Sequence, residues 1–191
     1  MLKLSISQEI LAWKFGANGM KWLKIVHIFL SILFFGGILS SFTLNFGLNL
    51  ADFDTVYATY RSLILISDNI VKWGAIGNLL LGFVYGALTT WGFFKHKWLT
   101  AKWIVYVTQT VLGIVLVDRL MVSNMLLLKT QGVAALTNPV FLHDHYLRQA
   151  VVVVQILLTL FILIVSGLKP WRNKAKQGSG ANSGRTQIRN H

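Results

Sequence analysis

The chain has 191 residues, of which 54% are hydrophobic and only 13% are charged, and its mean hydropathy is +0.60. Soluble domains carry about 25% charged residues, so this composition predicts an integral membrane protein with a single domain. The lack of cysteine excludes disulfides, thiolate metal sites and covalently attached haem. The net charge of +12 comes from basic residues at the ends of long apolar runs, which is typical of topology signals and argues against a nucleic-acid partner.

The first segment, residues 1–19, looks like a preamble to the membrane domain. Ser5 and Gln8 fit a capping box, and Gly16 and Gly19 end the run. Two interpretations stay open: a short interfacial helix, or an extension that precedes a natural start at Met20.

Four later stretches are long and apolar enough to cross a hydrocarbon core of about 30 Å, which takes about 20 residues. They are residues 22–46, 70–94, 103–125 and 147–168. The sequence therefore predicts an all-α, four-helix transmembrane bundle over residues 20–171. Residues 172–191 are basic and rich in Gly and Ser, and they predict a flexible cytoplasmic tail.

The orientation follows from the placement of Lys and Arg. Most of them precede the first span, lie between the second and third spans, or follow the fourth span. Because basic residues concentrate on the cytoplasmic side, we expect both termini in the cytoplasm and external segments over residues 48–68 and 130–144. The lipid bilayer is the first partner that this topology implies.

Each span carries a stripe of small and polar residues, as expected for helices that pack without a hydrophobic driving force. Such a stripe is explained either by packing alone or by a ligand cavity. The residues concerned are Gly36, Gly37, Asn78, Gly82, Gly86, Gln109 and Gln155.

Charged residues within spans are functional candidates because a charge inside the bilayer is costly. Asp118 and Arg119 are expected at the outer edge of the third span, and Arg148 lies at the start of the fourth. For Asp118 and Arg119 we favour a structural ion pair, with Arg148 or with an outer-loop Asp, and a proton relay is the alternative.

The histidines offer three possible ligand positions. His27 lies one turn inside the first span, where it either hydrogen-bonds a neighbouring helix or binds haem or a metal. His96, on the same side, is either the second haem ligand or a solvated loop residue. His143 and His145 form an H-x-H triplet that either holds an outer metal ion or lies in a surface loop.

Short motifs resemble a group of predicted bacterial membrane proteins related to the copper-resistance protein D family and to the HemJ-type protoporphyrinogen oxidases. They are KWLKIVHIFLSILFFGGILSSF with Phe34-Phe35-Gly36-Gly37, LTAKW at 99–103, and LKPW at 168–171. The resemblance implies a bacterial cytoplasmic membrane, a four-helix bundle and a histidine-bound cofactor, haem b, at His27.

Three functional hypotheses follow, and none of them fixes whether the protein is an enzyme. The first is a non-enzymatic accessory or assembly protein that contacts other membrane subunits or a second copy of itself. The second is a haem b protein that uses His27. The third is a small metal or cation transporter.

Overall fold

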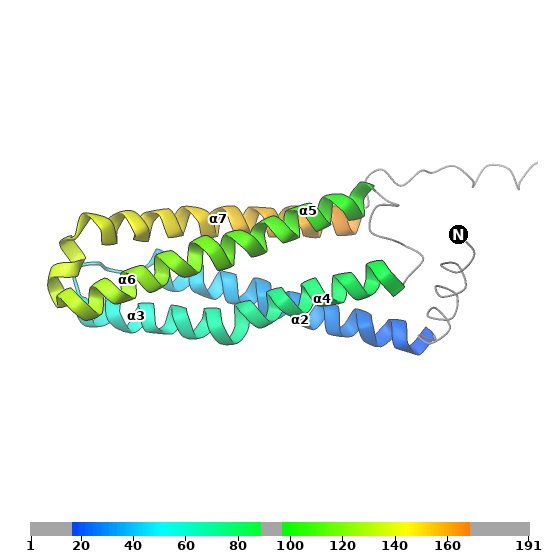
Figure 1. Cartoon of the computed structure of the whole chain (residues 1–191), viewed down its shortest axis with the longest axis horizontal. Coiled ribbons are helices and arrows are strands. Elements are labelled where there is room, and N and C mark those ends of the chain that lie inside the picture. Colours follow the sequence, from blue (N-terminus) through cyan, green and yellow to red (C-terminus); the bar gives the residue numbers. More distant parts are fainter. Residues whose placement is uncertain (1–16, 89–96, 169–191) are drawn as a thin grey trace, which may run out of the picture.

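The computed structural model describes residues 17–88 and 97–168, which form helices joined by short turns and contain no strand. The helices form four long rods, which lie side by side (Figure 1). The first is α2 (Ala17–Phe46) and the last is α7 (Pro139–Leu168). The second rod consists of α3 (Phe53–Ile66), the π-helical η1 (Ser67–Val71) and α4 (Lys72–Leu88). The third rod consists of α5 (Lys97–Val111), the π-helical η2 (Leu112–Val117) and α6 (Asp118–Gln131). The 3-10 helix η3 (Gly132–Thr137) follows α6.

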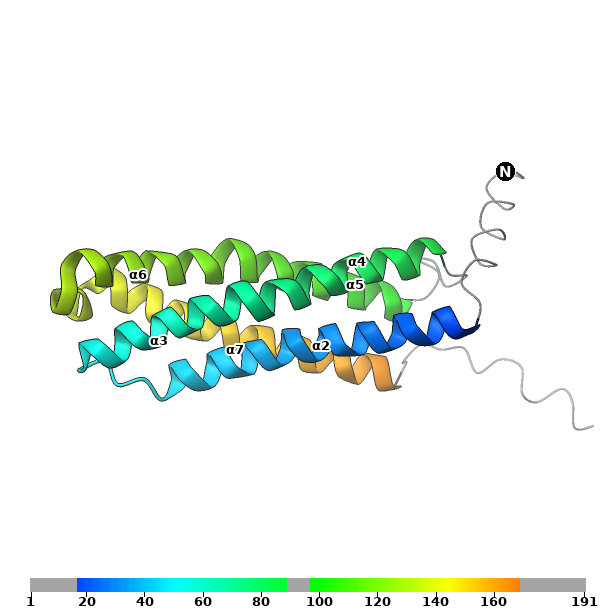
Figure 2. The ribbon, with the colours of Figure 1, turned by 90° about the horizontal axis from the view of Figure 1, so that it is seen from below.

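Each rod is long and apolar enough to span a membrane, which confirms the predicted all-α, four-helix bundle. Neighbouring rods run in opposite directions, so that the start of α2, the end of α4, the start of α5 and the end of α7 share one end of the bundle (Figure 2).

The helices extend further than the sequence predicted. The second rod begins at Phe53 instead of Ile70, the third continues to Gln131, and the fourth begins at Pro139. Most of the two expected external segments is therefore helix. The reason is an apolar stripe at helical spacing (Val56, Tyr60 and Leu63) that Asp, Arg and Ser on the other faces conceal from a hydropathy average.

These extensions form a well-packed end of the bundle, which we call the head: α3, α6, η3 and the first turns of α7. Its core consists of side chains that are at most 8% exposed, and those contributed by α3, α6, η3 and α7 are Val56, Tyr60, Leu63, Met121, Met125, Leu128, Ala135, Leu136 and Phe141. A helix of 35 residues is roughly 52 Å long, which exceeds a hydrocarbon core of about 30 Å. The head is therefore the part of the bundle that can project beyond the membrane.

The turn between α6 and α7 is specified locally. Gly132 follows the last residue of α6 and has a φ of 59°, a backbone conformation that residues with a Cβ rarely adopt. Asn138 then caps α7, because its Oδ1 accepts a hydrogen bond of 2.9 Å from the backbone N–H of Val140, and Pro139 occupies the first helical position.

Glycines set the close approach of α2 to the second rod. A Cβ on Gly74 would lie 2.6 Å from the backbone N of Phe34, and one on Gly37 would lie 2.6 Å from Cγ2 of Val71. Gly82 faces the indole of Trp103, where a Cβ would be 2.8 Å from Cζ2. Gly36 has no atom within 4 Å of its Cβ position, so the packing role expected for Gly36 is corrected.

Three predictions concern residues outside the described part of the chain. The preamble over residues 1–19 reaches the described helix only at its last three residues, which begin α2. The tail over residues 172–191 lies wholly outside the described ranges, as does His96.

Candidate functional site

Some of the small and polar residues predicted to form a stripe on each span lie in the interior of the bundle. Gln109 of α5 is fully buried, and Gln155 of α7 is 4% exposed. The Nε2 of Gln155 donates to the backbone O of Gln109 at 3.0 Å, and the Thr159 hydroxyl donates to Oε1 of Gln109 at 3.2 Å. These bonds join α5 to α7, as interhelical hydrogen bonds in membranes do.

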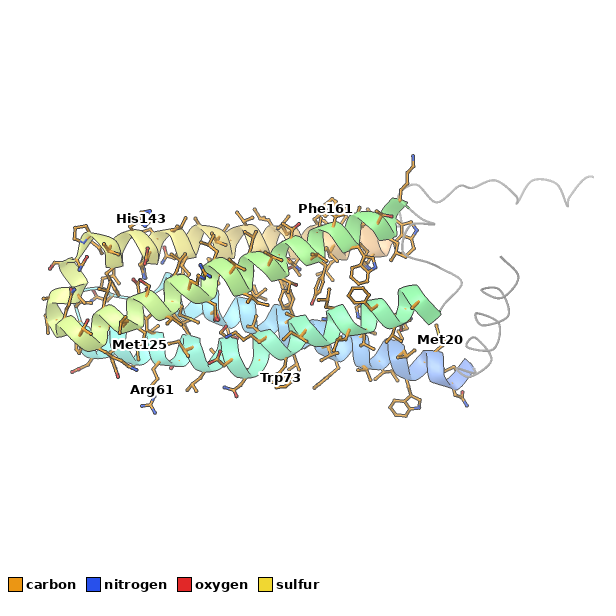
Figure 3. All side chains as sticks on the ribbon, in the orientation of Figure 1. Met20, Arg61, Trp73, Met125, His143 and Phe161 are labelled. Atoms are coloured by element: carbon orange, nitrogen blue, oxygen red, sulfur yellow. The ribbon has the colours of Figure 1, made fainter. Side chains whose placement is uncertain are left out.

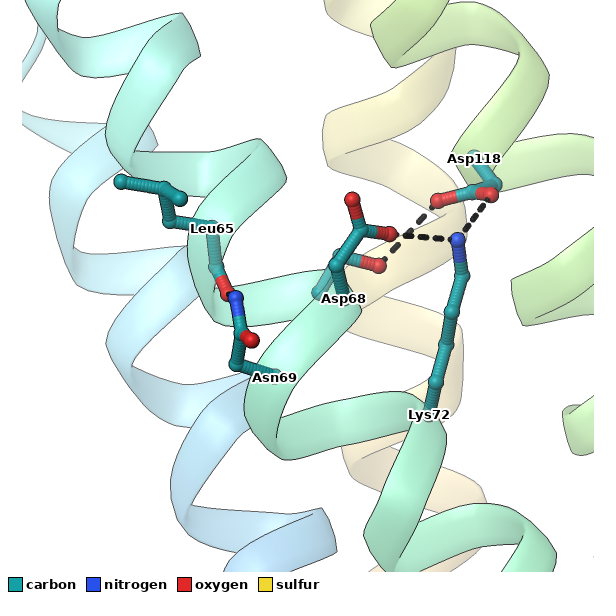
Figure 4. A network of polar contacts seen from close by, with 6 residues as sticks. Leu65, Asp68, Asn69, Lys72 and Asp118 are labelled. Atoms are coloured by element: carbon teal, nitrogen blue, oxygen red, sulfur yellow. Dashed lines mark hydrogen bonds and ion pairs between the residues drawn. The ribbon is translucent and has the colours of Figure 1, made fainter.

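A charged cluster joins the second and third rods at their π-helical turns (Figure 4). Lys72 lies 2.7 Å from the Oδ2 of Asp118 and 2.6 Å from the Oδ1 of Asp68, and the Ser67 hydroxyl donates to Asp118 at 3.1 Å. The sequence predicted an ion pair with Arg148 or with an outer-loop Asp for Asp118 and Arg119, so the observed pairing of Asp118 with Lys72 corrects that prediction. Arg119 is exposed on the outer surface of α6.

The two π-helical segments place this cluster. Ser67–Val71 and Leu112–Val117 each interrupt an α-helix in mid-rod, and such wide turns occur frequently at functional sites. Ser67 is the first residue of η1 and Lys72 directly follows η1, whereas Asp118 directly follows η2. The irregular turns therefore bring a lysine of one rod to an aspartate of the other.

Arg148 is the most deeply buried charge in the described structure, with only 1% of its surface exposed. Its Nε and Nη2 atoms are both buried and have no hydrogen-bond partner. Its Cζ lies 5.7 Å from the centre of the Tyr60 ring, over which the guanidinium packs. Within residues 17–88 and 97–168, the ion pairs are those of Lys72 with Asp68 and Asp118 and of His143 with Asp144; none includes Arg148.

A cavity of about 50 Å³ lies between the four rods and has Arg148 on its wall. Room for one water takes about 10–15 Å³ on this measure, so the cavity can hold a few waters or a small ion. Its polar lining includes Ser41, Ser67, Lys72, Gln109, Thr110, Arg148 and Gln155.

The side chains that line this cavity include four polar atoms without a hydrogen-bond partner, and these atoms share one chemical character. They are Nε and Nη2 of Arg148, Nε2 of Gln109 and the hydroxyl of Thr110. The first three donate hydrogen bonds only, and the hydroxyl can donate as well as accept. Gln109 bonds to Gln155, which is seven residues along α7 from Arg148, so the donors occupy two levels roughly 10 Å apart along that helix.

The head contains a further polar network around His145, which is 2% exposed. Its Nδ1 lies 2.9 Å from the Tyr60 hydroxyl, and that hydroxyl accepts a bond of 2.9 Å from Nδ2 of Asn124. His143, in contrast, has 71% of its side chain exposed. Residues two apart on a helix point about 200° apart, so the expected metal site formed by His143 and His145 together is corrected. The described residues contain no cluster of three or more His, Asp or Glu suited to a metal.

His27 is partly buried on α2. It lies about two turns along this helix from Met20, which is at the opposite end of the bundle from His143 (Figure 3). Its ring lies edge-on to Tyr85 of α4 at 6.2 Å, and its Nδ1 is buried without a hydrogen-bond partner. Asn78 lies nearby and is 3.4 Å from the hydroxyl of Ser31. Because His143 and His145 are at the far end, the described residues bring no second histidine to His27.

No protein-family model, curated protein or solved structure matches this chain. Its function is therefore inferred from the geometry of the site. Sequence reasoning singled out Arg148, Gln109 and Gln155 but missed Lys72 and Thr110. A lysine close to the predicted start of a span looks like a topology signal, and a lone threonine in an apolar run looks like packing.

Proposed function

We propose that this chain is a non-enzymatic membrane protein that binds a small anion at Arg148, inside its helical bundle. The supporting observation is that Arg148 is 1% exposed, lines a cavity and has two guanidinium nitrogens without partners. Burying an unpaired charge costs several kcal/mol, and charges within membrane spans mark ligand sites by default. An anion in the cavity supplies the missing partner.

The sign of the charge distinguishes among the hypotheses drawn from the sequence. Two charged side chains line the cavity, Lys72 and Arg148. The charge of Lys72 is met by Asp68 and Asp118, whereas Arg148 has no carboxylate within ion-pair distance in the described structure. The unpaired positive charge at Arg148 favours an anion at that position over the metal or cation cargo that the sequence suggested.

Thermal unfolding of the purified full-length protein in detergent tests this proposal. The reference buffer contains only bulky sulfonate anions, which exceed the cavity, and sodium chloride, nitrate or formate is then added. A ligand at about 100 times its Kd stabilises the folded state by about 2.7 kcal/mol, which raises the unfolding midpoint. We expect the same rise when choline replaces sodium.

The control pair is Arg148→Gln and Arg119→Gln, which remove the same charge from a buried and an exposed arginine. We expect Arg148→Gln to abolish the anion-dependent rise and Arg119→Gln to retain it. A rise that follows the cation, or that survives in Arg148→Gln, contradicts the proposal.

Haem b at His27 is a second candidate, favoured by the buried Nδ1 atom without a partner. His27 would hold the haem iron, with His96 as the predicted second ligand, and the haem would supply redox chemistry. The visible spectrum of protein expressed with supplied haem tests this candidate. A Soret band that His27→Ala removes and His143→Ala preserves supports it, and colourless protein refutes it.

For the setting of the site, we propose a bacterial cytoplasmic membrane with both termini in the cytoplasm and the head outside. The support is the excess of Lys and Arg at the end of the bundle opposite the head. An accessory role towards other membrane subunits, or towards a second copy of the chain, is compatible with a bound anion and no chemical step.

A further inference from the structure

We propose that the ligand of Arg148 is a compact, planar, monovalent oxyanion such as a carboxylate, nitrate or bicarbonate. This inference rests on the proposed anion site and names its ligand class. The two unpaired nitrogens of Arg148 are Nε and Nη2. These two atoms form one edge of the guanidinium. Their N–H bonds lie in the guanidinium plane and point in nearly the same direction.

That edge matches two oxygens of a planar anion. Arginine binds carboxylates through two parallel N–H···O bonds, which add geometric selectivity to the attraction between charges. A halide is a single spherical ion without oxygen atoms, so it cannot present one acceptor atom to each N–H bond in this way. The shape of the free edge therefore selects between anions of equal charge.

Tyr60 restrains the position of this guanidinium. The guanidinium carbon is 5.7 Å from the centre of the Tyr60 ring, within the range of a cation–π contact. The ring itself is held because its hydroxyl bonds to His145 and Asn124. A guanidinium held in advance loses less freedom when the anion binds, which favours a ligand that uses both N–H groups.

The size and charge of the site limit the ligand further. A cavity of about 50 Å³ with Leu63, Val117, Met121 and Val152 on its wall leaves room for a few non-hydrogen atoms. Asp118 and Asp68 already hold Lys72, so Arg148 is the cation left to meet the ligand. The second charge of a divalent anion would have no cation of its own and would lie near a cluster in which two carboxylates share one lysine, which favours a monovalent ligand.

Isothermal titration of the full-length protein in detergent with sodium nitrate, formate and chloride at constant ionic strength tests the inference. Hydrogen bonds to charged groups contribute about 1.5–3 kcal/mol, so we expect nitrate and formate to bind about tenfold more tightly than chloride. Arg148→Lys keeps the charge and loses the planar edge, so we expect it to bind chloride and to lose the preference for nitrate and formate. Arg119→Lys, the same substitution on the surface, should leave all three affinities unchanged.

Different outcomes would contradict the planar-oxyanion ligand and the anion site at Arg148. Chloride binding to the wild-type protein as tightly as nitrate and formate overturns the planar-oxyanion inference, and this comparison needs no variant to fold. A preference for nitrate and formate that persists in Arg148→Lys overturns it as well. Binding of all three anions that persists in Arg148→Gln overturns the anion site itself.

Discussion

At the scale of single residues, the buried charge of Arg148 lowers the stability of the fold and at the same time can bind an anion. Its guanidinium is buried beside apolar side chains, and two of its N–H groups have no partner. A residue kept only for packing would be better served by an uncharged side chain of similar volume, because replacing buried charges with apolar groups is often neutral or stabilising. The position therefore has the character of a binding residue.

We predict that Arg148→Met stabilises the ligand-free protein. Removing the unpaired charge should raise the free energy of unfolding by about 1–3 kcal/mol in buffer without small anions, partly offset by the lost contact with Tyr60. Thermal unfolding in detergent measures this effect, and the exposed Arg119→Met should change little. A clear loss of stability in Arg148→Met would instead make Arg148 a structural residue.

The sequence identified Arg148 and Asp118 as charges within spans but paired them incorrectly. Pairing depends on which way each side chain points, and the prediction assumed 100° per residue along whole spans. Each π-helical turn shifts that phase, so Asp118, directly after η2, turns to Lys72. A phase shift of this kind has no clear signature in a run such as LGIVLV.

At the scale of helices, the existence and number of the rods were predictable and their ends were not. Hydropathy reports the part of a helix that lipid surrounds. It does not report α3 or the start of α7, where the buried stripe alternates with exposed polar residues such as Asp54, Arg61 and His143. Helical periodicity at Val56, Tyr60 and Leu63 was the available signal for α3.

We predict that Gly74→Leu strongly destabilises the bundle, because a Cβ there would meet the backbone of Phe34 at 2.6 Å and backbone cannot move aside cheaply. Overpacking of this kind costs about 1–3 kcal/mol. The matched control is Gly36→Leu on α2, whose Cβ position has no neighbour within 4 Å. Unfolding midpoints in detergent compare the two, and equal midpoints would contradict the observed approach of α2 and α4.

At the scale of the whole molecule, the anion site lies just beneath the head. Arg148 follows the first turns of α7, and its neighbour Tyr60 belongs to the core of the head. In the topology that we propose, the head is outside the membrane and the cavity lies close to the outer boundary of the hydrocarbon core. An anion from the outer aqueous phase then has a short way to travel to it.

Labelling with a membrane-impermeant maleimide tests this arrangement, and the chain has no cysteine of its own to interfere. We predict that Val133→Cys, 68% exposed in the head, reacts in intact cells. Asn18→Cys, at the other end, should react only after the cells are permeabilised. Leu157→Cys, 59% exposed on the side of α7, should face lipid and react in neither case. The reverse pattern for Val133 and Asn18 would invert the topology.

The most direct test of the anion site is a crystal structure of the full-length protein soaked in sodium bromide, in which anomalous scattering locates bromide ions. Even a spherical anion that binds more weakly should occupy the cavity at soaking concentration. We predict an anomalous peak in the cavity within hydrogen-bond distance of Nε or Nη2 of Arg148, and no such peak in Arg148→Gln. Peaks confined to exposed basic residues, with the cavity empty, would contradict an anion site at Arg148.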